Sequence, residues 1–157
     1  MFNEIEAQTY LEQNYPTPAD KINCQVLNLG IKAENNSNGL EVKLTGSLDL
    51  TGFVNLKELW CGGQNITSLN LQDCSKLEYL DCSKNQLIKL IFSSQLTNLE
   101  TPTCHENFLT DLGWAVLNGE KLTILSLKNN NSSLQNLNFL SKFTNLKELI
   151  LGSWNQT

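Results

Sequence analysis

A cysteine, a histidine and a glutamate stand side by side at Cys104-His105-Glu106, and together they could supply a nucleophile and a general base. His105 is the only histidine of the chain, so any imidazole chemistry would use it. The surrounding pattern predicts a β-strand here, and neighbouring strand residues point to opposite faces. Cys104 is therefore expected inside and His105 outside, which prevents a hydrogen-bonded dyad. We predict no catalytic residue.

Three cysteines, Cys61, Cys82 and Cys104, recur at equivalent positions of a repeating pattern. Such a series could suggest zinc, but tetrahedral zinc needs four ligands that converge on one point. Cys24 and Cys74 fall at other positions of the pattern and supply no obvious fourth ligand. Parallel side-chain directions also disfavour a disulfide between neighbours, and five cysteines cannot all pair within one chain. We expect reduced thiols in the core, with no metal and no cofactor.

These residues belong to an internal repeat, and the repeat determines the expected fold. The pattern Leu-x-x-Leu-x-Leu/Cys-x-x-Asn-x-Leu begins near residues 24, 56, 77, 99, 122 and 146. From residue 56 onward the spacings are 21, 22, 23 and 24 residues, and the first copy has an insertion over residues 33–43. The ninth position holds Asn85, Asn107 and Asn130, with Lys32, Gln64 and Trp154 as replacements.

The repeat resembles leucine-rich repeats, in particular the short Cys- and Asn-rich type of certain fungal proteins. The stretches 48–59 and 77–87 are similar to those repeats, and residues 7–16 are similar to the segment that precedes them. The resemblance implies an α/β fold, a right-handed solenoid with a parallel sheet of about six short strands on its concave face. It also implies 3-10 and short helical turns on the convex face. Some members of this group contain a protein-kinase-like domain elsewhere, which nothing here matches.

The expected organisation is an N-terminal helical cap over residues 1–23 followed by repeats over residues 24–157. A short helix before Pro16 is predicted from its apolar stripe, and two further helices are expected over residues 111–118 and 136–143. The chain ends midway through a repeat, at Trp154-Asn-Gln-Thr157, which predicts a truncated C-terminus.

Two positions predict details of the backbone. The ninth-position asparagine can donate and accept hydrogen bonds, so a stack of such residues should satisfy the turn that follows each strand. Pro102 replaces a leucine inside a strand and lacks a backbone N–H, which predicts a local break or bulge in the ladder, with Cys104 restoring the register.

The side chains that alternate with the core residues form the candidate partner-binding face. Leu59, Leu80, Leu125 and Leu149 are predicted to be buried. Trp60 and Tyr79 lie on adjacent repeats, and aromatic residues often anchor protein partners. The predicted partner-binding residues on the concave face are Glu58, Trp60, Tyr79, Asp81, Thr103, His105, Ile124, Lys128 and Ile150.

The expected function is non-enzymatic recognition of another protein through this face, as part of a longer signalling or scaffold protein. The alternative is a structural or assembly unit that forms a homodimer through its open C-terminal edge. A third hypothesis, an enzyme, would need a catalytic domain outside this sequence.

A net charge of −5 disfavours nucleic acid and anionic membranes as partners. No window has the roughly 18 apolar residues of a membrane span and no secretory signal opens the chain, so a cytoplasmic location is expected.

Overall fold

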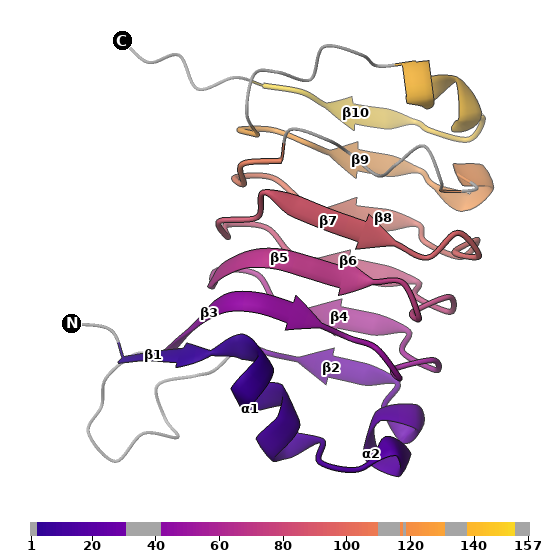
Figure 1. The fold of residues 1–157 in the computed structure, drawn as a ribbon. Coiled ribbons are helices and arrows are strands. Elements are labelled where there is room, and N and C mark those ends of the chain that lie inside the picture. Colours follow the sequence, from indigo (N-terminus) through magenta and orange to yellow (C-terminus); the bar gives the residue numbers. More distant parts are fainter. Residues whose placement is uncertain (1–2, 31–41, 110–116, 118, 131–137, 153–157) are drawn as a thin grey trace, which may run out of the picture.

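The chain coils into a stack of turns, a parallel-sheet solenoid (Figure 1). The computed structural model describes residues 3–30, 42–109, 117, 119–130 and 138–152. The insertion expected over residues 33–43 and the helix expected over residues 111–118 lie almost wholly outside this part of the chain. Within it, no helix is long and apolar enough to cross a membrane.

One side of the solenoid is a parallel sheet of six strands in the order β2-β4-β6-β8-β9-β10. The register aligns equivalent repeat positions, so that Leu59 of β4 lies opposite Leu27 and Leu80. This sheet confirms the predicted set of about six short strands. Its strands are β2 (Val26–Asn28), β4 (Glu58–Trp60), β6 (Tyr79–Asp81), β8 (Thr101–Thr103), β9 (Ile124–Ser126) and β10 (Glu148–Ile150).

The return side of the solenoid differs from the prediction of 3-10 and helical turns alone. A second parallel sheet lies there, in the order β1-β3-β5-β7 (Figure 1). Its strands are β1 (Asn3–Glu6), β3 (Val42–Asp49), β5 (Asn65–Leu71) and β7 (Lys89–Phe92). The returning segments bury Ile66, Leu69 and Leu71 from an extended backbone, which lets each segment pair with the turn before it. Among the described residues, the expected 3-10 helices occur in the later turns, as η3 (Gly119–Lys121) and η4 (Asn138–Lys142).

The N-terminal segment contains two helices and also a strand. β1 pairs with β3, so residues 3–6 extend the second sheet instead of belonging to a helical cap. Helix α1 (Ala7–Asn14) follows, with Ala7 and Leu11 fully buried. Helix α2 (Pro18–Asn23) begins with a capping box between Thr17 and Asp20. Together these elements cover the first turn of the core (Figure 1).

The core is a column of leucine side chains between the two sheets. Leu59, Leu80 and Leu125 are fully buried, as predicted. The prediction is wrong for Leu149, which is only partly buried. Leu149 belongs to β10, the last strand of the six-stranded sheet, and the described part of the chain places no further turn against its outer side. A position therefore needs a neighbour on both sides to be fully buried in this stack.

Pro102 weakens the ladder on one side only. β8 is a regular strand, and Pro102 lies directly opposite Leu80 of β6, so the expected bulge does not occur. Between β8 and β9, however, the pairing is reduced to Thr103 with Ser126. Two residues on, the Cys104 amide donates to the Ser126 carbonyl at 3.3 Å, so the proline removes the donor that precedes this bond.

Candidate interaction surface

The outward side chains of the six-stranded sheet form a surface that we call the strand face. Alternation along each three-residue strand places the first and third side chains outside and the middle one in the core. The apolar residues exposed on this face include Val26, Trp60 and Ile124. The strand face consists of Val26, Asn28, Glu58, Trp60, Tyr79, Asp81, Thr101, Thr103, Ile124, Ser126, Glu148 and Ile150.

Two aromatic rings stack on the strand face where β4 and β6 lie side by side. The ring centroids of Trp60 and Tyr79 are 4.1 Å apart and their planes differ by 28°. In the register of β4 and β6, Trp60 lies opposite Asp81 and Tyr79 lies opposite Glu58, so the stack is diagonal. Trp60 remains 36% exposed, which leaves part of the ring available to a partner.

Two carboxylates flank this stack. The indole N–H of Trp60 donates to Glu58 Oε2 at 3.2 Å. Asp81 Oδ1 accepts hydrogen bonds from the Ser83 amide at 3.0 Å and the Ser83 hydroxyl at 2.7 Å. A Cβ atom at Gly62 would lie 2.9 Å from Asp81 Oδ1, so glycine there gives the carboxylate room. Both carboxylates are thus held in place on the sheet surface.

The pKa of the Tyr79 hydroxyl reflects these surroundings. Burial of the hydroxyl raises its pKa above the ordinary value of 10.0, and the negative charges of Asp81 and Glu58 raise it further. Tyr79 is therefore a neutral phenol at physiological pH. The stack is an uncharged aromatic surface between two negative groups.

The remaining predicted partner-binding residues lie away from the stack. Thr103 is the partly exposed last residue of β8. Ile124 belongs to β9 and Ile150 to β10, the two strands that follow β8 in the sheet, and Ile124 is 37% exposed. Lys128 follows β9, and a Cβ atom at Gly152 would lie 3.2 Å from its Cγ atom. The structure thus brings Glu58, Trp60, Tyr79 and Asp81 together, whereas the other residues extend along the same side of the solenoid.

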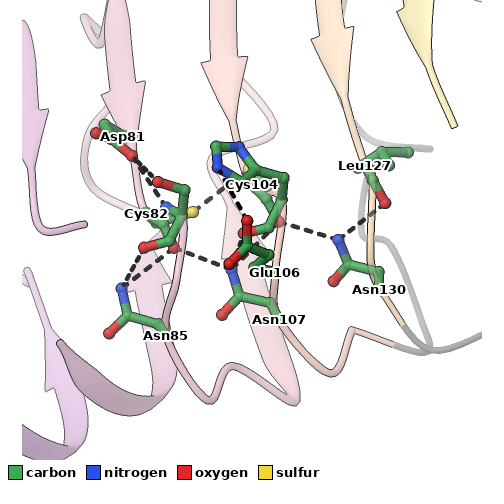
Figure 2. A network of polar contacts seen from close by, with 10 residues as sticks. Asp81, Cys82, Asn85, Cys104, Glu106, Asn107, Leu127 and Asn130 are labelled. Carbon is green, nitrogen blue, oxygen red and sulfur yellow. Dashed lines mark hydrogen bonds and ion pairs between the residues drawn. The ribbon is translucent and has the colours of Figure 1, made fainter. Parts of the chain in front are cut away.

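The Cys104-His105-Glu106 segment has the geometry of a core strand and a surface turn. Cys104 is fully buried, whereas His105 is partly exposed and its Nε2 atom lies 3.8 Å from Glu106 Oε1 (Figure 2). The Cys104 sulfur instead contacts the core neighbour Cys82, whose thiol donates to it at 3.4 Å. The histidine and the thiol face different surroundings, as the alternation of the strand predicted.

The buried thiols are poor nucleophiles. Burial raises the pKa of Cys61 well above its ordinary value of 9.0. The hydrogen bond to Cys104 and burial do the same to the pKa of Cys82. Burial also raises the pKa of Cys74 to about 12. Among the residues that the structure describes, no three His, Cys, Asp or Glu side chains are grouped as a metal site would require.

The ninth-position asparagines form a ladder beside the strand face, in which Asn85 and Asn107 are buried and Asn130 is partly exposed (Figure 2). Asn107 Nδ2 donates to the carbonyls of Cys82 at 3.0 Å, Cys104 at 3.2 Å and His105 at 3.3 Å, and Asn107 Oδ1 accepts from the Leu87 amide at 3.0 Å. Asn85 makes the same set of three donated bonds and one accepted bond, and Asn130 makes two donated bonds and one accepted bond. In each case the asparagine joins its own turn to the turn before it.

Gln64 was expected to approximate the asparagine, and among the described residues it provides the acceptor half of the pattern: its Oε1 accepts from the Leu44 amide at 2.9 Å. The repeat also has a feature that the sequence reasoning missed. The residue before each ladder position is left-handed, with φ of 72° at Gly63, 53° at Lys84, 55° at Glu106 and 56° at Asn129. Gly63 at this position was the available signal.

Comparison with known protein families and with curated proteins finds no match to this chain. The assignment of function therefore depends on the geometry of the strand face.

Proposed function

We propose that this chain is a leucine-rich-repeat module that recognises another protein through its strand face and catalyses no reaction. The leucine-rich-repeat assignment is supported by the regular register of the six-stranded sheet and by the asparagine ladder at the ninth position. The observation on which the function depends is the partly exposed Trp60–Tyr79 stack on the six-stranded parallel sheet. Stacked aromatic rings of this kind lose little conformational entropy on binding and provide apolar contact area.

A random peptide library displayed on phage tests this proposal. Peptides selected on the wild-type protein should lose at least about tenfold in affinity for the variant Trp60→Ala/Tyr79→Ala. A matched control is Ile88→Ala/Phe108→Ala, which removes two exposed apolar side chains outside the strand face. Selected peptides that bind both variants as tightly as the wild type, or a library that yields no binder, would contradict recognition at this surface.

A second function, self-association through β10, is favoured by one observation. Leu151, just after β10, is 44% exposed, and Leu149 is only partly buried. An open strand edge can pair with the same edge of a second copy. Sedimentation velocity over a range of concentrations should then show a dimer that Leu151→Lys dissociates. A monomer at every concentration would reject this alternative.

A further inference from the structure

The Trp60–Tyr79 stack and its two flanking carboxylates have a chemistry more specific than general protein recognition. We propose that Trp60, Tyr79, Glu58 and Asp81 form a binding site for an arginine side chain of a partner protein, an inference that rests on the proposed function of the strand face. The partner segment would lie across the strands and place its guanidinium group on the aromatic stack.

The aromatic rings provide a surface for a flat cation. Trp60 and Tyr79 stack on each other with one face each, so the stack leaves the second face of each ring unused. Next to Tyr79, strand β8 presents only Thr101 and Thr103, whose side chains are short. A guanidinium group is planar and weakly hydrated, and it stacks on such faces better than an ammonium group does.

The carboxylates provide the opposite charge at the edges of the stack. Glu58 uses Oε2 for the indole N–H, and Asp81 uses Oδ1 for Ser83. Within the part of the chain that the structure describes, Glu58 Oε1 and Asp81 Oδ2 receive no hydrogen bond. The five N–H donors of a guanidinium group could satisfy both oxygens while the group lies on the ring.

The charge of the surrounding strands complements a cation. Strands β2, β4, β6 and β8 contain no lysine or arginine, so no strand residue of this region neutralises the two carboxylates. Lys57, which precedes β4, is paired with Glu78 at 3.5 Å. Lys128 follows β9, two strands from β6. The same pair of carboxylates repels a phosphate, which disfavours nucleic acid and anionic lipid at this site.

Two synthetic peptides that differ only in charge test the site. One is acetyl-Gly-Thr-Arg-Thr-Gly-amide, and the other has citrulline, a neutral group of the same shape, in place of arginine. Binding is followed by NMR through the indole N–H signal of Trp60, which is assigned with the variant Trp60→Phe. The arginine peptide should shift this signal saturably, and the citrulline peptide should bind at least about fivefold more weakly.

Charge-neutral variants test whether the carboxylates of Glu58 and Asp81 are the groups that bind the arginine peptide. Glu58→Gln/Asp81→Asn should lower the affinity for the arginine peptide to that for the citrulline peptide. The matched control Glu12→Gln/Glu120→Gln removes two exposed carboxylates elsewhere and should leave the affinity unchanged. Equal binding of the two peptides, or no shift of the Trp60 signal at about 10 mM arginine peptide, would overturn the proposal.

The failure of this site is distinguishable from the failure of the recognition function. Phage-selected peptides that lack arginine, lose affinity for Trp60→Ala/Tyr79→Ala and bind Glu58→Gln/Asp81→Asn normally would leave recognition intact and overturn the arginine site. A library without binders, together with an arginine peptide that binds as expected, would overturn the general recognition function and leave the arginine site intact.

Discussion

The middle of the solenoid and its last described turn have the same repeat pattern but different environments. In the middle, Leu80 lies between Leu59 and Pro102 and is fully buried, and Cys82 beside it is also inaccessible. In the last turn, the equivalent Leu149 has a partner only in Leu125 and is partly buried, and Leu151 is 44% exposed. The same repeat pattern therefore gives unequal burial, because a turn of a solenoid is covered by its two neighbours.

Leucine truncation should show the largest difference between the two regions. Leu80→Ala leaves a cavity between two packed turns and should cost about 3–4 kcal/mol of unfolding free energy. Leu149→Ala removes a partly buried side chain and should cost about 1 kcal/mol. Urea unfolding followed by circular dichroism measures both. Similar costs for the two variants would mean that the last turn is covered as well as the middle.

The asparagine ladder should show the same gradient on a smaller scale. Asn107→Ala leaves several buried backbone groups without a partner and should cost about 2–3 kcal/mol. Asn130 is more exposed, so water can replace its bonds and Asn130→Ala should cost about 1 kcal/mol.

The aspartate variant Asn107→Asp separates the two halves of the ladder bond. It retains the acceptor for the Leu87 amide but cannot donate to the three carbonyls. It should destabilise at least as much as alanine does. A tolerated aspartate would show that the acceptor alone matters, as it does at Gln64.

Much of this arrangement could be predicted from the sequence, because the repeat period determines which positions share an environment. The inward leucines and thiols and the role of the ninth-position asparagine all follow from alternation and from the need to satisfy a buried turn. The second sheet could not be predicted in the same way. Ile66, Leu69 and Leu71 are spaced irregularly, and that spacing suits either an extended return or a helical one.

The candidate site was predicted only as a set of outward residues. Alternation placed Trp60 and Tyr79 on one surface, but their stacking depends on side-chain torsions across a diagonal of the sheet. The hydrogen bonds from Trp60 to Glu58 and from Ser83 to Asp81 depend on the same torsions. Such contacts leave no periodic signal in a sequence.

Alkaline pH should destabilise the folded chain, and the buried thiol of Cys74 should contribute to this loss. In the unfolded chain the Cys74 thiol ionises near 9.0, whereas burial holds its folded pKa at about 12. The folded state thus retains a proton that the unfolded state loses, so this contribution to stability is complete below pH 9.0 and is lost as pH rises toward about 12. The expected loss is about 1 kcal/mol per pH unit in that window.

A cysteine variant checks the source of this loss. Cys74→Ala should reduce the slope of unfolding free energy against pH by about one proton, while Cys61 and Cys82 continue to contribute. The same samples should react with a thiol reagent only after unfolding. An unchanged slope in Cys74→Ala would show that the thiol does not determine the alkaline loss.

Pro102 lies where the middle of the stack joins its later turns, and its replacement should produce the smallest effect. Pro102→Leu restores the leucine of the other strands and supplies an N–H toward β9, where only Thr103 and Ser126 are now paired. The new hydrogen bond should contribute about 1 kcal/mol, and the greater freedom of the unfolded chain should offset about half of it. We therefore expect a net gain of about 0.5 kcal/mol, with slower amide exchange in β9.

Pro102→Ala supplies the same N–H without the leucine side chain, so a gain confined to Pro102→Leu would assign the effect to packing. A loss of stability in both variants would show that the proline ring, and not the missing donor, determines how β8 contacts β9.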